Sequence, residues 1–427
     1  MTRQSRRSPM AIVERSTRLP FPAEAVSGWY ARPGAHERLT PPWDRVDGLA
    51  GGAVARWGHR HSITPDVSAG CVVTDRVEYP QAAGALGARI GSARERRRIE
   101  RLLAYRHAIL AQDLAAHARF AGRGTLRIAI TGAGGLVGRA LAAFLSAGGH
   151  TVLPLVRRPA QAGEIAWSPG TPIDPAGLEG TDAVIHLAGE NIAAGRWTAA
   201  RRDRIRDSRL RGTTSLADAI SRLRRAPRVL VSAAAIGIYG NRGDELLDDD
   251  SSPGPPGRFL GDLCREWEAA ADPARRAGIR VALPRFGAVL SPAGGALAKM
   301  LPVFRAGLGG PVGGGRQWMS WLSVEDAVGA VHHALFTGSL DGHFNAVAPT
   351  PVTNAEFTRT LGRVLGRPAL LPVPAVALRV VFGAMADETV LPSARVVPSR
   401  LLASGYAFRH PRLEDALRFE LGRFAAG

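Results

Sequence analysis

The sequence predicts an α/β fold built on a doubly wound parallel sheet, and two observations lead to this prediction. Strand-like and helix-like segments alternate from residue 125 onward, a pattern typical of βαβ units with helices on both faces of a parallel sheet. A cluster of glycines stands where the first of these strands passes into the first helix. Because the chain has 427 residues, two or three domains are expected.

The alternation can be followed segment by segment through the chain. Hydrophobic runs and periodicity predict strands at 126–131, 150–156, 182–189, 228–235 and 280–291, and helices at 136–147 and 213–224. From about Gly338 the chain is rich in helix-forming segments punctuated by proline. These patterns predict a central domain of residues 125–340 and a C-terminal lobe of residues 341–427.

A separate unit is predicted ahead of the central domain. Residues 1–12 are expected to form a disordered basic tail, and residues 13–120 a domain with a strand at Gly70–Tyr79. The segment 92–120 predicts a long helix, since apolar residues recur every three or four positions: Ile99, Leu102, Leu103, Tyr105, Ile109, Leu110 and Leu114. The sequence "AGRG" at 121–124 is interpreted as a linker.

Composition narrows the class of protein. Apolar residues make up 45% of the chain, enough for a sizeable core, and no run approaches the ~18 apolar residues of a membrane span. The basic start "MTRQSRRSPM" has no apolar segment behind it, so no secretory signal is predicted. The two cysteines, Cys71 and Cys264, lie far apart and fit a reducing cytoplasm.

The formal net charge of +18 raises the question of nucleic-acid binding. Lys299 is the only lysine, so the excess is almost entirely arginine scattered over predicted helices. No helix-turn-helix, zinc-finger or RNA-binding signature accompanies it, and nucleic acid is not expected as a partner. A basic bias still favours a phosphorylated ligand.

The glycine cluster has the form T-G-x-x-G-x-x-G between a strand and a helix. In such a loop Gly132 allows a sharp turn, Gly135 lets a ligand approach the backbone, and Gly138 lets the helix pack tightly on the sheet. The helix then directs its free N–H groups and positive dipole end at the loop, which favours a pyrophosphate. The predicted cofactor site also includes Gly134, Leu136 and Val137.

The end of the second strand indicates which dinucleotide is bound. NAD-binding proteins place an acidic residue about 20 positions past the glycines, where it holds the ribose 2′-hydroxyl. Here Arg157 and Arg158 occupy that place. Arginine suits a 2′-phosphate, so NADP(H) is predicted over NAD(H); the alternative is two solvated surface arginines.

The third strand, in "DAVIHLAGEN", ends in a turn of small residues. Leu187, Ala188 and Gly189 are predicted to leave room for a cofactor ribose. His186 lies within the strand, where a single histidine is more often a packed core residue than a catalyst.

Several motifs in order resemble a known family. "ITGAGGLVGRAL", "VIHLAGENI", "RWTAARRDRIRDSRLRGT", "LVSAAAIGIYGNRGDE", "FLGDLCREWEAAA" and "QWMSWLSVEDAVGAV" are similar to atypical extended short-chain dehydrogenases, and more narrowly to the bacterial epimerase family proteins. The resemblance covers about residues 126–422. It implies a Rossmann fold, NADP(H) in the glycine loop, a C-terminal lobe over the cofactor, a small-molecule substrate and, as one option, a homodimer.

The chain departs from the wider superfamily at the catalytic positions. Extended dehydrogenases use a Y-x-x-x-K pair, in which the tyrosine exchanges the proton and the lysine lowers its pKa. The equivalent place here is "FLGDL", with Phe259 and Leu263, neither of which transfers a proton. Ser232 is present, but the usual hydroxyl position is Ala234 or Ala235.

Other residues are candidates for the missing roles, each with a structural alternative. Tyr239 lies near the site in sequence and is a candidate proton donor, or packs in a turn under the cofactor. Arg209 is a candidate for binding an anionic group, or is a surface arginine. Cys264 is a candidate reactive thiol, or a small buried hydrophobe. Ser232 completes the catalytic candidates and is also predicted to contact cofactor.

The segment "RQWMSWLSVEDAV" resembles the one that closes the substrate side in sugar-nucleotide enzymes. Trp318, Trp321, Glu325 and Asp326 are its candidate residues. The structural alternative is that Glu325 and Asp326 cap a helix that follows Ser323.

The N-terminal unit resembles a START-like, polyketide-cyclase-like fold, in which a sheet wraps a long helix around an apolar cavity. The resemblance rests on residues 16–43, "RWGHRHSITP" and "TDRVEY". Only 13 residues separate Trp43 from Trp57, so about two hairpins of that fold are expected to be missing. His59 and His61 share one side of a strand, but no third ligand is evident and no metal is predicted.

Three hypotheses for function follow. The first is an NADP(H)-dependent epimerase or oxidoreductase acting on a small, sugar-nucleotide-like substrate with a non-standard proton donor. The second is a protein that holds NADPH without turnover, as a structural or redox-sensing ligand. The third is a carrier of hydrophobic ligands through residues 13–120.

Overall fold

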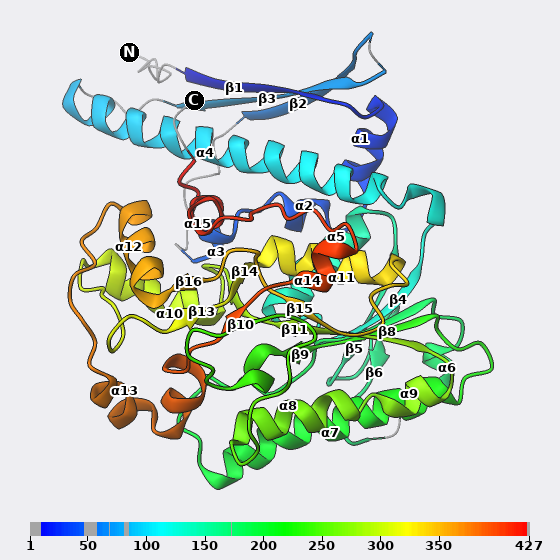
Figure 1. Cartoon of the computed structure of the whole chain (residues 1–427). Helices are drawn as coiled ribbons and strands as arrows, with labels where there is room; N and C mark the ends of the chain where they lie inside the picture. The colour runs from blue at the N-terminus through cyan, green and yellow to red at the C-terminus, as the bar shows by residue number, and fades with distance from the viewer. Residues whose placement is uncertain (1–9, 47–57, 68, 81–84, 172, 425–427) are drawn as a thin grey trace.

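The computed structural model describes residues 10–46, 58–67, 69–80, 85–171 and 173–424. Within them the chain stacks in layers (Figure 1). A small antiparallel sheet and the long helix α4 (Ala85–Ala118) form one side, and a parallel sheet covered by helices on both faces forms the body of the molecule. We call the unit up to the end of α4 the N-terminal layer.

The central sheet is parallel throughout its main path and runs in the order β15-β11-β8-β7-β4-β5-β6. Its strands are β4 (Arg127–Thr131), β5 (Thr151–Val156), β6 (Ile165–Ala166), β7 (Ala183–His186), β8 (Val229–Ser232), β11 (Arg280–Phe286) and β15 (Gly342–Ala346). The short β9 (Ala234–Ala235) also pairs with β11. The strand order reverses between β4 and β7, and ligands of doubly wound sheets bind at such a switch point. The fold class predicted from the sequence is therefore confirmed for this body.

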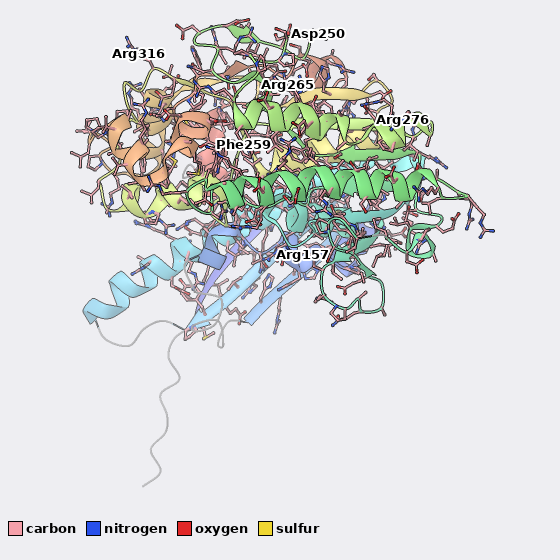
Figure 2. The ribbon with its side chains drawn as sticks, turned by 90° about the horizontal axis from the view of Figure 1, so that it is seen from below. Arg157, Asp250, Phe259, Arg265, Arg276 and Arg316 are labelled. Atoms are coloured by element: carbon pink, nitrogen blue, oxygen red, sulfur yellow. The ribbon has the colours of Figure 1, made fainter. Side chains whose placement is uncertain are left out.

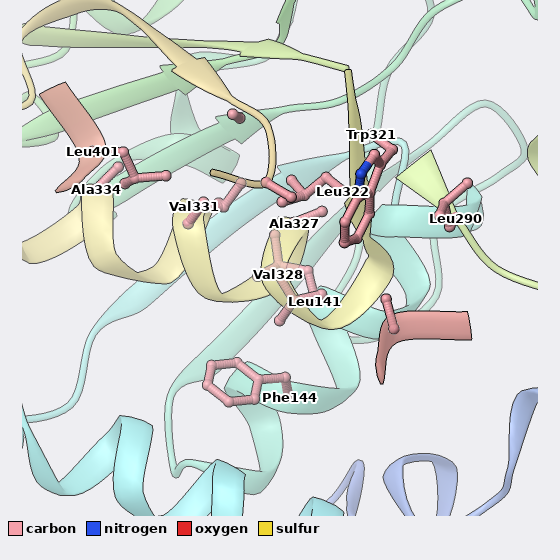
Figure 3. Close-up of a cluster of buried hydrophobic side chains, with 14 of the residues drawn as sticks. Leu141, Phe144, Leu290, Trp321, Leu322, Ala327, Val328, Val331, Ala334 and Leu401 are labelled. Atoms are coloured by element: carbon pink, nitrogen blue, oxygen red, sulfur yellow. The ribbon is translucent and has the colours of Figure 1, made fainter. Parts of the chain in front are cut away.

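Helices cover the two faces of this sheet. α5 (Leu136–Ala147) and α11 (Val324–Phe336) lie on the face toward the N-terminal layer, where their apolar side chains form the largest core cluster (Figures 1 and 3). α7 (Ala199–Ser221), α8 (Phe259–Ala269) and α9 (Asp272–Arg276) lie beyond the other face, and the short α6 is Pro175–Leu178. Phe144 of α5 and Trp321 before α11 are both fully buried in the first cluster.

Several predicted elements have different bounds in the structure; the long helix expected at 92–120, for example, is Ala85–Ala118, and two other differences have a clear physical reason. The helix expected at 213–224 begins 14 residues earlier, because Thr198 caps it by accepting a hydrogen bond from the N–H of Arg201 (3.2 Å). Its first half is rich in solvated arginine and shows little apolar periodicity. The strand expected at 280–291 divides into β11 and β12 (Ala288–Leu290) at Gly287, where a Cβ would lie 2.5 Å from the carbonyl oxygen of Ser320.

The C-terminal lobe gathers short elements from two stretches of the chain. They are α10 (Gly295–Arg305), β13 (Trp318–Met319), β14 (Trp321–Ser323), β16 (Val352–Thr353), α12 (Asn354–Leu365), α13 (Ala375–Phe382), a π-helical turn (Ala386–Val390), β17 (Arg395–Val396), α14 (Ser399–Ala403) and α15 (Leu413–Glu420). β17 pairs with β10 (Leu246–Leu247), and β12 pairs with β14. The boundary expected after residue 340 falls just before β15, which belongs to the central sheet.

The N-terminal layer consists of β1 (Met10–Leu19), β2 (Gly58–Pro65) and β3 (Cys71–Pro80) in the antiparallel order β1-β3-β2, with α1 (Ala23–Ala31), α2 (Ala35–Arg38) and α3 (Pro42–Val46). Side chains of the sheet and α4 fill the space between them, among them Val13, Val77, Ile99 and Leu103. The sheet lying on a long helix is consistent with the expected START-like layer, whose identity stays a prediction.

Some expectations for this layer fall on residues outside the description. The expected tail, residues 1–12, lies mostly there, and Met10–Ile12 begin β1. The short connection between Trp43 and Trp57 lies largely there as well. His59 and His61 are described: the ring of His61 stacks on Tyr30 (centroids 4.7 Å apart), and His59 binds Asp75 (Nε2 to Oδ1, 2.6 Å).

Candidate functional site

The glycine loop lies at the carboxyl end of β4, beside the end of β7. Gly132 has φ +72°, and a Cβ there would lie 2.8 Å from the backbone nitrogen of Ala188. A Cβ at Gly138 would lie 2.1 Å from the carbonyl oxygen of Gly132. Both positions therefore need glycine for the strand, loop and helix to approach one another this closely. A Cβ at the exposed Gly134 would meet no described atom within 4 Å, so this side of the loop is open.

The loop presents the free end of a helix. Gly135 is the N-cap of α5, and no side chain caps this helix. The first-turn N–H groups, which include those of Leu136, Val137 and Gly138, have no partners within the helix. Together with the helix dipole they form a site suited to the pyrophosphate of a dinucleotide.

The two arginines after β5 are not equivalent. Arg158 forms two hydrogen bonds to the carboxylate of Glu164 (2.7 and 2.6 Å). Arg157 is exposed and has no hydrogen bond or ion pair with any residue in the described ranges (Figure 2). Of these two arginines, Arg157 is therefore the one whose guanidinium has no partner among the described residues. It lies at the place where a 2′-phosphate is expected.

The end of β7 is held by a short hydrogen-bond chain. The N–H of Ala188 donates to Thr131 Oγ1 (3.3 Å), and this hydroxyl contacts Nδ1 of His186 (2.7 Å). Burial, and secondarily Arg209, lower the pKa of His186 to about 4, so the ring is neutral near pH 7. This geometry supports the interpretation of His186 as a core residue. Ser232 lies opposite His186 in the neighbouring strand β8, fully buried, and its hydroxyl has no partner among the described residues.

Arg209 braces the turn that follows β7. Its guanidinium lies over the ring of Trp267 (4.9 Å to the centroid) and donates to the carbonyl oxygen of Glu190 (3.1 Å). A Cβ at Gly189 would lie 3.4 Å from the guanidinium carbon. Arg209 is therefore not a free surface arginine but part of the wall beside Gly189.

Tyr239 lies in a buried polar network. Its hydroxyl accepts a hydrogen bond from Arg285 (2.9 Å) and lies within donating distance of Asn345 Oδ1 (2.9 Å) and the carbonyl oxygen of Asp248 (3.0 Å). Arg285 in turn binds both oxygens of Glu268 (2.7 and 2.9 Å). Burial raises the pKa of Tyr239, although Arg285 opposes this. These contacts favour the packing alternative over a proton donor.

Apolar residues and one arginine, Arg202, surround the place where the resemblance puts a tyrosine and a lysine; the guanidinium lies over the ring of Phe259 (5.5 Å to the centroid). Phe259 opens α8 (Figure 2). Its ring contacts the ring of Trp197 edge-on (centroids 5.1 Å apart), and Leu263 is buried one turn later in a cluster that includes Met385 of the C-terminal lobe. Burial, with a smaller effect of Glu268, raises the pKa of Cys264 to about 12. The thiol is therefore protonated near pH 7, which supports its interpretation as a small hydrophobe.

The segment before α11 has a structural role. The helix expected after Ser323 is present, but Ser323 itself caps it by accepting a hydrogen bond from the N–H of Asp326 (3.0 Å), and Glu325 and Asp326 lie in its first turn. Trp321 is fully buried and donates to the carbonyl oxygen of Thr350 (3.0 Å). Trp318 instead donates to Asp244 at the surface (2.8 Å).

Glu325 belongs to a buried charge network that the sequence does not reveal. Arg38 of α2 binds Asp113 of α4 (2.7 and 2.8 Å) and Glu325 of α11 (3.1 and 2.5 Å). Arg409 binds the same two carboxylates (3.0 and 3.1 Å). Burial opposes ionisation of Asp113, but Arg38 and Arg409 outweigh it and lower its pKa. Two positive and two negative groups thus join the N-terminal layer, α11 and the C-terminal segment.

Three histidines meet near this network. His117, His150 and His332 place one ring nitrogen each within 4.8 Å of the others. The N–H of Leu126 donates to Nδ1 of His150 (3.0 Å), so the neutral ring carries its proton on Nε2 and offers no lone pair there. The rings also contact Phe144 and Phe336, and we assign the cluster to packing.

The parallel sheet with its reversed strand order, the uncapped helix and the glycine loop define a Rossmann-type dinucleotide-binding protein. The chain belongs to the NAD dependent epimerase/dehydratase family, whose model matches residues 128–346. A domain of unknown function (DUF1731) matches residues 373–420 of the C-terminal lobe. No helix within the described ranges is both long and apolar enough to span a membrane.

Named relatives agree with this assignment. An epimerase family protein of Mycobacterium tuberculosis is 45% identical over 298 residues, which are 69% of this chain and 98% of the relative. The crystal structure of the human epimerase family protein SDR39U1 (isoform 2) with NADPH is 36% identical, with a TM-score of 0.63, and the match covers 70% of this chain and all of that one.

A third similarity extends to the N-terminal layer. The crystal structure of the nucleoside-diphosphate sugar epimerase from Corynebacterium glutamicum is 31% identical with a TM-score of 0.78. The match covers 96% of this chain and 90% of that one. Coverage this high includes most of the N-terminal layer, whereas the human and mycobacterial matches cover about 70% of the chain.

Proposed function

We propose that this protein binds NADP(H) in preference to NAD(H) and acts as an epimerase or oxidoreductase on a small, sugar-nucleotide-like substrate. The observation that carries the proposal is the uncommitted Arg157 beyond the glycine loop, at the place where a 2′-phosphate is expected. NADPH in the human relative supports the cofactor, and the nucleoside-diphosphate sugar epimerase of C. glutamicum supports the substrate class.

The protein groups around the cofactor have distinct proposed roles. The first-turn N–H groups of α5 hold the pyrophosphate, Arg157 holds the 2′-phosphate, and Leu187, Ala188 and Gly189 leave room for a ribose. Arg209 and Ser232 position the adjoining turn and strand end. When bound, the reduced cofactor would supply a hydride for a carbonyl carbon of the substrate, and the oxidised cofactor would accept a hydride from a carbinol carbon and return it in an epimerisation.

A second candidate function is cofactor binding without turnover. It is favoured by the apolar surroundings of Phe259 and Leu263, where the wider superfamily has its proton donor. Tyr239 and Cys264 do not readily replace that donor, since the hydroxyl is engaged by Arg285 and the thiol has a raised pKa. Under the first function the proton comes from the substrate or from solvent.

Calorimetric titration with NADPH and NADH tests the cofactor preference. We expect NADPH to bind wild type at least tenfold more tightly, a difference of about 1.4 kcal/mol. Arg157→Ala should abolish this difference. Arg158→Ala is the matched control and should retain it, because Glu164 already engages that guanidinium. Equal binding of both nucleotides by wild type contradicts the preference, and binding of neither contradicts the function.

Turnover separates the two candidate functions. NADPH oxidation is followed at 340 nm with a panel of carbonyl compounds, and nucleotide sugars are analysed for epimerisation. Product formed in proportion to enzyme supports the first function. Tight NADPH binding with no product across the panel supports the second.

A further inference from the structure

A cavity of about 410 Å³ lies between the N-terminal layer and the glycine loop. Gly134, Gly135 and Arg139 line it from the central domain, and Thr40 and Tyr105 line it from the N-terminal layer. Its volume is in the range of small-molecule sites. The cavity therefore joins the open side of the proposed pyrophosphate site to a part of the chain that the family model does not cover.

Arg139 is an unbalanced charge on this cavity. It lies in the first turns of α5, is exposed, and has no hydrogen bond or ion pair with any residue that the structure describes. A positive side chain near the positive end of a helix is unfavourable unless an anion lies close by. An anionic ligand at the loop would be stabilised by the arginine and by the helix end together.

Tyr105 supplies an independent observation from the opposite wall. Its side chain is 3% exposed, and its ring is packed against Trp43 and Phe419 (centroids 5.0 and 5.3 Å apart). Among the described residues its hydroxyl has no hydrogen-bond partner. Burial keeps the pKa of Tyr105 well above 10, so the hydroxyl is a permanent donor. A hydroxyl that has no partner in the described protein, on an otherwise buried side chain that lines a cavity, is available to donate to an acceptor on a ligand.

The other charged groups on the cavity are balanced. The carboxylate of Glu325 is neutralised by Arg38 and Arg409, and Glu37 has a partner of its own. The wall is also held in place, because α2 packs on α5 so closely that a Cβ at Gly34 would lie 2.3 Å from the carbonyl oxygen of Ala143. Arg139 thus leaves the cavity with a net attraction for anions.

We infer that the N-terminal layer forms one wall of the dinucleotide site, in which Arg139 and the hydroxyl of Tyr105 bind the diphosphate of the cofactor across the cavity. The inference rests on the proposed cofactor function and assigns that function two further binding residues. Since the diphosphate is common to both nucleotides, these residues contribute affinity without selecting between NADPH and NADH.

The test uses the full-length chain and measures dissociation constants for NADPH and NADH by calorimetry. Arg139→Gln and Tyr105→Phe should each weaken both at least tenfold, because the first removes a positive charge beside the diphosphate and the second removes a hydrogen bond to a charged group. The ratio of the two constants should stay at its wild-type value. Arg60→Gln, at an exposed arginine of β2, is the matched control and should change nothing.

The melting temperature of each variant, measured without nucleotide, shows whether the variant is folded. Tyr105→Phe should not lower the melting temperature, because the hydroxyl has no partner in the protein. If wild type binds NADPH and both variants bind it as tightly as wild type does, the inference that the N-terminal layer forms a wall of the dinucleotide site is refuted. The proposed function is then unaffected. If wild type binds neither nucleotide, the proposed function fails and this inference fails with it.

Discussion

Replacing Arg38 by methionine should strongly destabilise the protein. The change removes four hydrogen bonds to Asp113 and Glu325, of 2.5 to 3.1 Å, and the guanidinium that lies over the ring of Phe144, while keeping an unbranched side chain. Arg409 then faces two carboxylates whose side chains are 0% and 5% exposed, so one negative charge is left uncompensated. Removing one partner of a buried ion pair costs about 3–5 kcal/mol, and we expect this loss in the free energy of unfolding.

Equilibrium urea unfolding followed by tryptophan fluorescence measures this loss. Arg76→Met is the matched control, because Arg76 is 44% exposed and its pairs with Glu14 and Glu78 should contribute less than about 1 kcal/mol. Adding Glu325→Gln to Arg38→Met restores charge balance, so the double variant should lose less stability than the sum of the single losses. A loss below about 1 kcal/mol for Arg38→Met would refute the reasoning.

Three further predictions concern pH, the glycine loop and the thiol. Burial lowers the pKa of His117 and His186 to about 4 in the folded protein, whereas both histidines titrate near 6.5 in the unfolded chain. The unfolded chain therefore binds more protons between these values, and the free energy of unfolding falls as the pH is lowered from about 6.5 toward 4, by up to about 3 kcal/mol for His186. Urea midpoints that do not change between pH 7 and 4 would contradict this. Gly138→Ala should lower the melting temperature and weaken NADPH binding at least tenfold, because the new Cβ collides with the carbonyl oxygen of Gly132. Gly134→Ala is the control and should leave the melting temperature unchanged. Equal melting temperatures for the two variants would argue against the close packing at Gly138. Cys264 should react with a thiol reagent only after unfolding, and rapid labelling of the native protein would show that the thiol is accessible.

The sequence predicts much of the central domain because the signals there are local. β4 and β7 are short buried strands whose apolar runs are visible in the chain, and α5 occupies Leu136–Ala147, the bounds that its periodicity predicts. The spacing of Gly132, Gly135 and Gly138 likewise reports a strand-to-helix turn within eight residues. A pattern contained in one segment needs no information about distant parts of the chain.

Charged side chains were harder to interpret from the sequence. Arg157 and Arg158 look alike in the chain, and only the position of Glu164 distinguishes them. Glu325 was a candidate for the substrate side, whereas the structure buries it between Arg38 and Arg409. The sequence does carry one signal for Arg139, because a positive residue near the start of a helix is unfavourable without an anion close by.

The sequence by itself determined the parallel sheet and the glycine loop, because each is a local pattern. That Phe259 and Leu263 stand where the wider superfamily has a tyrosine and a lysine stays a prediction from the resemblance. Only the tertiary structure decided that α2 packs against α5, that His117 of α4 contacts Phe144 of α5, and that Tyr105 lines a cavity shared with Gly134. Those contacts join residues separated by tens to hundreds of positions. They depend on the shape and charge of surfaces that form only when the two layers meet, and no periodicity within either segment encodes them.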